Sequence, residues 1–204
     1  MFTGLVRELG EVQSLKGAKL TIKAKHKAKL GDSIAVNGAC LTAIEILQNG
    51  FVLELSEETQ KQVVLESYKG LVHIEPALSL GERLDGHLVQ GHIDGVGKIV
   101  DIKKHKVGTD FFIKVDSNTL KFCTPKGSIA INGISLTINE VLDFSIRLTI
   151  IPHTLKNTLF NAYKIGDRVN IETDCLARMV WHFMQKKPIS KLSWSEVDSI
   201  LGGY

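Results

Sequence analysis

Two short motifs with matched polar side chains are the best candidates for chemistry in this 204-residue sequence. Residues 37–42 read NGACLT, and residues 132–137 read NGISLT. The motifs differ at one position that could bear a nucleophile, because the first carries Cys40 and the second carries Ser135. Unequal residues in a repeated motif predict two similar pockets that do different work.

Residues 86–95 carry two histidines and three glycines. His87 and His92 are five positions apart, so on a regular strand they would face opposite sides and make poor joint metal ligands. We expect one of them to face a pocket and the other to be exposed or structural. His92, beside Gly91, is the natural proton carrier near neutral pH. We therefore expect His92→Gln to lower turnover strongly and His87→Gln to cost little.

Each candidate also has a purely structural interpretation. A single histidine is most often a satisfied structural residue, and Cys40 could be a small buried hydrophobe. Ser135 and Thr137 could be ordinary strand residues. Asp174 precedes an apolar helical pattern and could be its N-cap or a catalytic group. The residues alone leave both interpretations open.

The motifs belong to a repeat that runs through most of the chain. Residues 71–75 (LVHIE) match 168–172 (RVNIE), and residues 4–6 (GLV) match 91–93 (GHI). Short strands with turn signals every ten or so residues predict small closed barrels. We expect an all-β protein with two barrel domains and a helical tail, divided as 1–86, 87–174 and 175–204.

The tail has its own signals. Leu176, Met179, Val180, Phe183 and Met184 recur at helical spacing and form one apolar face. That face packs either on its own barrel or on copies of the chain. A capping box at Ser193 and Glu196 predicts a second short helix.

Composition excludes several classes of protein. The net charge is only +3, and the basic run over residues 19–29 lacks interleaved aromatics, so it favours a solvated face over a nucleic-acid site. The three cysteines show neither a metal-ligand spacing nor a disulfide framework. No segment matches a phosphate-binding loop, a dinucleotide fingerprint, a secretory signal or a membrane span. We expect a cytoplasmic protein without a metal or a membrane partner.

Six segments together resemble the barrel-type alpha chain of riboflavin synthase, a lumazine-binding family. They are residues 1–6, 37–42, 86–94, 126–137, 151–155 and 169–174. The resemblance covers nearly the whole chain up to about Pro188. One departure is His73, where the family usually has the asparagine that the second copy keeps as Asn170. It lies on a strand outside the motif turns.

The resemblance implies two six-stranded Greek-key barrels per chain, followed by a C-terminal helix that joins three chains. It implies a transferase that completes riboflavin biosynthesis without a cofactor. Two molecules of 6,7-dimethyl-8-ribityllumazine would react, one giving a four-carbon unit to the other. The products would be riboflavin and 5-amino-6-(D-ribitylamino)uracil. The active site would lie between the first copy of one chain and the second copy of a neighbour.

The resemblance also implies two sets of site residues. The first copy would bind one lumazine through Gly4, Leu5, Val6, Ser33, Cys40, Leu41, Thr42, Glu54, Leu55, Ser56, Glu57, Glu58 and Thr59. The second copy would bind the other through Gly91, His92, Ile93, Lys126, Ser135, Leu136, Thr137, Ile151, Pro152, His153, Thr154, Leu155 and Lys156. The catalytic candidates are His92, Ser135, Thr137, Cys40 and Asp174.

Several points stay open at this level. The donor and acceptor pockets, the nucleophile that adds at C7 of the acceptor ring, and an association with lumazine synthase are undetermined. The main alternative is a lumazine- or flavin-binding antenna protein of the same fold, since a fold does not fix a function. A transport or structural barrel without pterin specificity is a weaker alternative, because both motifs are kept.

Overall fold

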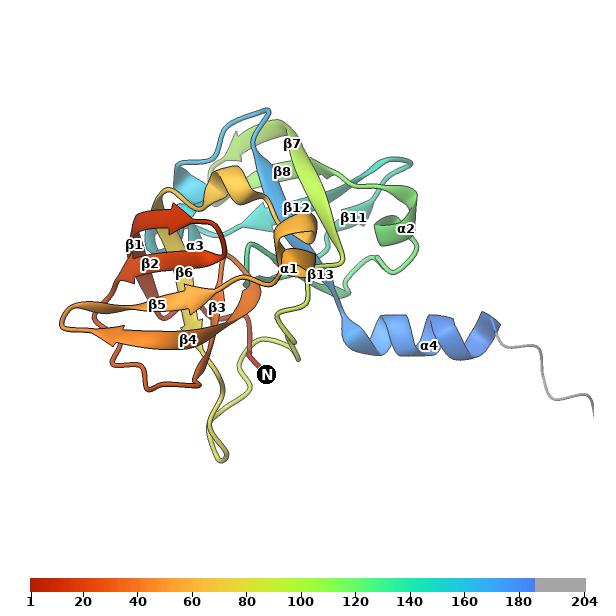
Figure 1. Cartoon of the computed structure of the whole chain (residues 1–204). Helices are drawn as coiled ribbons and strands as arrows, with labels where there is room; N and C mark the ends of the chain where they lie inside the picture. Colours follow the sequence, from red (N-terminus) through yellow and green to blue (C-terminus); the bar gives the residue numbers. More distant parts are fainter. Residues whose placement is uncertain (186–204) are drawn as a thin grey trace, which may run out of the picture.

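The computed structural model describes residues 1–185, which form two β units and one projecting helix (Figure 1). The structure confirms the mostly β fold with a C-terminal helix that the sequence predicts: the first unit is a closed barrel, and the second is a seven-stranded half-barrel sheet. The capping box at Ser193 and Glu196 lies outside the described residues.

The first unit is a closed barrel in which strands distant in sequence pair with each other. Its strand order is β1-β2-β5-β4-β3-β6. The strands are β1 (Glu8–Lys16), β2 (Lys19–Lys23), β3 (Ser33–Val36), β4 (Ala39–Leu47), β5 (Gly50–Glu54) and β6 (Gly70–Pro76). Alternating apolar side chains such as Leu20 and Ile22 point inward and are fully buried.

The second unit follows the same plan with one broken strand. Its strands are β7 (Gly95–His105), β8 (Gly108–Lys114), β9 (Ser128–Ile131), β10 (Ile134–Thr137), β11 (Glu140–Val141), β12 (Ser145–Ile150) and β13 (Arg168–Thr173). β10 and β11 lie at the two ends of the sheet order β10-β9-β13-β7-β8-β12-β11. Only Ile138 and Asn139 separate them, and together they take the place of β4, which itself has a bulge between Ala43 and Glu45.

Short helices occupy equivalent places in the two copies. α1 (Glu57–Gln62) and η1 (Leu65–Ser67) follow β5, just as α3 (Pro152–Asn157) and η2 (Leu159–Asn161) follow β12. The second copy adds α2 (Ser117–Leu120). The C-terminal helix α4 (Cys175–Gln185) projects away from both β units in Figure 1.

The repeated Asn-Gly turns meet each other at the seam between the units. In both turns the asparagine and the glycine have positive φ: 44° at Asn37, 86° at Gly38, 46° at Asn132 and 80° at Gly133. Two positive φ values are typical of a tight hairpin turn. A Cβ at Gly38 would lie 2.7 Å from the backbone nitrogen of Gly133, so the close approach requires glycine on both sides.

The residues before each first strand cross over to the other unit. The backbone N–H of Ser135 donates to the carbonyl of Gly4 (2.8 Å), and that of Cys40 donates to the carbonyl of Gly91 (2.9 Å). Val6 packs against the core of the second unit, and Ile93 packs against the core of the first. The two copies are therefore interlocked through their leading segments.

The regular strand considered for His87 and His92 is absent, because β7 begins only at Gly95. Before it, the chain is irregular apart from one bridge between Phe2 and Val89. His87 and His92 do not lie on one regular strand, so the prediction that they face its opposite sides is wrong. The physical reason is that the backbone of residues 87–91 forms its hydrogen bonds with the first copy and with the Glu172 carboxylate.

Among residues 1–185, no helix has the length and apolarity needed to cross a membrane.

Candidate functional site

A pocket of about 390 Å³ lies where the second leading segment meets the first barrel. Cys40 on β4 forms one side of it, and Glu58 and Thr59 on α1 form another. Gly91 and His92 close it from the second copy. Ala39, Gln62, Val63 and Ile93 complete its lining.

Hydrogen bonds at the edges of this pocket fix its shape. Ser56 caps α1, because its hydroxyl accepts from the backbone N–H of Thr59 at 3.1 Å. Gly91 has a φ of 81°, and a Cβ there would lie 2.5 Å from the Cβ of Cys40. Only glycine lets the segment approach the thiol so closely.

A second cluster lies where the first leading segment meets the second unit. Gly4 packs on Ser135, and a Cβ at Gly4 would lie 2.7 Å from the Ser135 backbone nitrogen. His87 Nδ1 lies 2.7 Å from the Ser135 hydroxyl oxygen. This pairing was not expected, since the sequence favoured His92 over His87 as the functional histidine.

His87 is the functional candidate that sequence reasoning undervalued. Its side chain is 8% exposed, and its Nε2 is buried without a hydrogen-bond partner among the described residues. Burial lowers the pKa of His87, and the nearby negative charge of Asp174 partly opposes that effect. A neutral imidazole beside a hydroxyl can accept or return a proton. In the sequence, only its position beside the repeated glycines indicated that His87 could have a functional role.

The structure groups the implied binding residues differently from the resemblance. Gly4, Leu5 and Val6 join Ser135 in the second unit, whereas Gly91, His92 and Ile93 join Cys40 in the first. The leading segments are exchanged between the copies. A sequence repeat gives no information about such an exchange, because it identifies equivalent residues in the two copies and not the residues that are in contact.

The remaining implied residues are distributed as follows. Ser33 and Thr42 are cross-strand partners on β3 and β4. Leu41 and Leu55 are core side chains, which leaves only their backbone for ligand contact. Glu54 ends β5, and Glu57 begins α1.

The other implied residues of the second copy lie on β10, in and before α3, and in the turn before β9. Lys126 is exposed at a backbone position with a φ of 65°. Leu136 and Thr137 follow Ser135 on β10. Ile151 N-caps α3, which contains Pro152, His153, Thr154, Leu155 and Lys156.

Asp174 has a demonstrated structural role. Its carboxylate accepts from the backbone N–H of Leu176 at 2.8 Å, which satisfies a free donor in the first turn of α4. This is the capping role that the sequence offered as one alternative.

Two buried carboxylates hold the leading segments in place. Glu75 accepts from the backbone of Thr3 (2.7 Å) and Gly4 (3.0 Å). Glu172 accepts from the backbone of Gln90 (2.7 Å) and Gly91 (2.9 Å). Burial raises the pKa of Glu75 and raises that of Glu172 to about 7, although these N–H donors counteract the shift.

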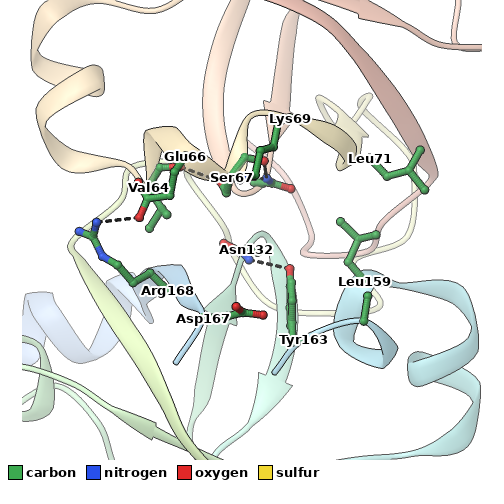
Figure 2. Close-up of a pocket in the computed structure, with 12 residues that line it drawn as sticks. Val64, Glu66, Ser67, Lys69, Leu71, Asn132, Leu159, Tyr163, Asp167 and Arg168 are labelled. Atoms are coloured by element: carbon green, nitrogen blue, oxygen red, sulfur yellow. Dashed lines mark hydrogen bonds and ion pairs between the residues drawn. The ribbon is translucent and has the colours of Figure 1, made fainter. Parts of the chain in front are cut away.

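Another cavity, of about 460 Å³, lies in the seam between η1 and η2 (Figure 2). Arg168 pairs with Glu66 at 2.7 Å on one side of it, and the Asn132 amide donates to the Tyr163 hydroxyl at 2.6 Å on the other. Among its described lining residues there is no cysteine or histidine. We interpret it as part of the junction between the units.

Neither site contains a metal-binding constellation. No group of three or more histidine, cysteine, aspartate or glutamate side chains within residues 1–185 could hold an ion. Cys40, Cys123 and Cys175 are free thiols.

Comparisons with known proteins decide the family. The family model for the lumazine binding domain matches twice, over residues 3–77 and 90–174. The chain is 35% identical to riboflavin synthase of Photobacterium phosphoreum over 97% of this chain and 96% of that protein. It is 39% identical to the Actinobacillus pleuropneumoniae riboflavin synthase over 92% of each. The chain belongs to the riboflavin synthase family. It is an enzyme of that family.

Solved structures support the fold of this family member. Crystal structures of LumP with 6,7-dimethyl-8-(1'-D-ribityl) lumazine and with riboflavin superpose with TM-scores of 0.74 and 0.76. Each superposition covers 85% of this chain and 99% of the LumP chain, and the sequence identities are 20% and 22%. At these identities the likeness establishes the shared fold.

Proposed function

We propose that this enzyme binds two molecules of 6,7-dimethyl-8-ribityllumazine and transfers a four-carbon unit between them. The products are riboflavin and 5-amino-6-(D-ribitylamino)uracil. The observation that carries this proposal is the pair of related but unequal sites, Cys40 with His92 and Ser135 with His87. A dismutation needs two similar sites for one substrate, with different chemistry in each.

The reaction requires a proton to leave the acidic C7 methyl group of one lumazine and a nucleophile to add at C7 of the other. His92 is exposed at the Cys40 pocket and can exchange protons with a bound ring. Ser135 and Thr137, both on β10, are the groups that we assign to hydrogen bonding with the substrate at the second site. Holding two rings face to face supplies much of the barrier reduction through positioning.

Assembly completes this proposal. The five side chains of the apolar face of α4 remain exposed, from 54% at Met179 to 75% at Met184. A projecting helix with an uncovered apolar face favours association with copies of the chain over packing on its own barrel. We propose a homotrimer in which the first copy of one chain faces the second copy of its neighbour. The division at residue 86 falls within the connection between β6 and β7.

The direct test is to incubate the purified enzyme with the lumazine alone and to follow riboflavin by absorbance and chromatography. Riboflavin and 5-amino-6-(D-ribitylamino)uracil should appear in equal amounts without an added cofactor. Binding of the lumazine without turnover would contradict the proposal and favour an antenna function.

A further inference from the structure

The segment 90–94 contributes Gly91, His92 and Ile93 to one wall of the Cys40 pocket, and it is held from two sides. On the first barrel, the Gly91 carbonyl accepts from the backbone N–H of Cys40 at 2.9 Å. On β13, the Glu172 carboxylate accepts from the backbone of Gln90 and Gly91. The segment therefore connects the pocket to β13.

The far end of the segment is attached to the same strand. The Asp94 carboxylate accepts from both the backbone N–H and the hydroxyl of Thr173, each at 2.7 Å. Thr173 is the last residue of β13, immediately before the cap of α4. The wall of the pocket is thus fixed on the residues that lead into the helix.

Arg178, in the first turns of α4, joins both ends of the segment. Its Nη2 donates to the side-chain oxygen of Gln90 at 2.7 Å, and its Nη1 forms an ion pair with Asp94. Nη1 also donates to the Thr173 carbonyl at 2.8 Å. The Arg178 and Asp94 side chains are only 22% and 23% exposed, so solvent screens their attraction less than at an open surface. His92 lies midway between the two anchored residues.

The first copy has no corresponding connection within the described chain. Glu75 holds Thr3 and Gly4 as Glu172 holds its partners. The residue aligned with Asp94 is Arg7, however, which is exposed, and β6 ends at Pro76 instead of leading into a helix. The contacts of Arg178 therefore couple the helix to the Cys40 pocket.

We propose that Arg178 is a positioning residue that makes the Cys40–His92 pocket depend on α4. The guanidinium fork fixes both ends of a short irregular segment, so a shift of α4 displaces His92 and the Gly91 wall together. Because α4 is also the proposed contact between chains, assembly would set the geometry of this pocket. The catalytic consequence rests on the proposed function, whereas the geometric consequence does not.

The test replaces Arg178 with Met, which keeps the apolar stem and removes every donor. We expect Cys40 to react several-fold faster with Ellman's reagent, because the Gly91 wall no longer covers it. Cys123 and Cys175 are buried, but Cys175 lines a pocket with Arg178, so both are replaced by alanine in every protein compared and Cys40 alone reacts. Turnover should fall by roughly tenfold to a hundredfold, as expected when a reacting group is displaced by about 1 Å. Arg178→Lys should restore part of the loss, since an ammonium keeps the charge without the fork.

Arg168→Met is the matched control, because it removes an ion pair at the seam and should leave both readouts at the wild-type level. Asp94→Asn provides a second variant of the same contact if Arg178→Met does not fold. Unchanged Cys40 reactivity in a correctly assembled variant would overturn the proposal, even if turnover fell through loss of assembly. Failure of the wild-type enzyme to make riboflavin would refute the proposed function, while the Cys40 rates would still decide the role of Arg178.

Discussion

His73 and Asn170 occupy equivalent positions in the two units and make equivalent pairs of hydrogen bonds across the seam. The Asn170 amide donates to the Asn37 carbonyl (2.9 Å) and accepts from the Val64 backbone (2.8 Å). His73 contacts the Asn132 carbonyl through Nδ1 (3.0 Å) and accepts from the Leu159 backbone at Nε2 (2.9 Å). The second bond requires an unprotonated Nε2, so the imidazole must be neutral with its proton on Nδ1.

This relationship predicts an acid-sensitive seam. Burial lowers the pKa of His73 from 6.5 to about 4, so the unfolded chain binds the proton more readily than the folded one. The stabilisation is complete above pH 6.5 and is lost as the pH falls toward 4, by on the order of 3 kcal/mol. His73→Asn should preserve both bonds at pH 7 and weaken this dependence.

Urea unfolding of the wild type and of His73→Asn at pH 7 and pH 4.5 measures the effect. The pKa of Glu172, raised to about 7, acts with the opposite sign, because its stabilisation is present at low pH and declines as the pH rises toward 7. That contribution is common to both proteins and cancels in the difference. His153→Asn, at an exposed histidine on α3, should behave as the wild type. Equal acid sensitivity in His73→Asn would show that the seam does not depend on the imidazole.

Gly91 lies against Cys40 and Gly4 lies against Ser135, so a substitution at either glycine should impair only the site that it contacts. Gly91→Ala should impair the Cys40 pocket and Gly4→Ala the Ser135 cluster, because each new methyl group meets backbone or Cβ atoms within 3.0 Å. Each positive φ adds about 1–2 kcal/mol of backbone strain. Gly17→Ala has a φ of 58° and open space around its Cβ, so it isolates the strain alone.

Lumazine binding stoichiometry, measured by fluorescence titration, reports the outcome. Wild type and Gly17→Ala should bind at both sites, and each of the other two variants should lose one. Loss of both sites in either variant would indicate a general collapse of the seam.

Histidine substitutions test the division of labour. His92→Gln should lower kcat by roughly 10²- to 10⁴-fold, the usual worth of a positioned acid–base group. The contact between His87 and Ser135 revises the expectation that His87→Gln costs little, and we now expect about a tenfold loss, the worth of one hydrogen bond. Steady-state rates at saturating lumazine measure both. Comparable losses from the two variants would mean that the acid–base role is shared or misassigned.

Removal of residues 175–204 tests assembly. The truncated chain should be monomeric by light scattering and should have greatly reduced turnover, because it loses both the apolar face of α4 and the Arg178 contacts. A single change on that face, Met184→Lys, should dissociate the chains while keeping Arg178. A truncated protein that stays trimeric and fully active would exclude α4 from assembly.

The repeated motifs, the turn signals and the helical spacing of residues 176–184 were sufficient to predict two barrels, the C-terminal helix and the family. These signals are local or periodic, so a sequence contains them directly. The cap at Asp174 could be predicted for the same reason, because capping depends on residues a few positions apart. Cys40, His92 and Ser135 could be named as candidates from the motifs alone.

Only the tertiary structure decided which residues face each other. The exchange that places Gly91 on Cys40 and Gly4 on Ser135 depends on how the two units dock, and similar repeats are compatible with either pairing. The pairing of His87 with Ser135 depends on residues 87–94 leaving the regular strand that alternation suggested. Contacts between residues far apart in sequence arise from packing and buried hydrogen bonds, such as those of Glu75 and Glu172, that no local pattern encodes.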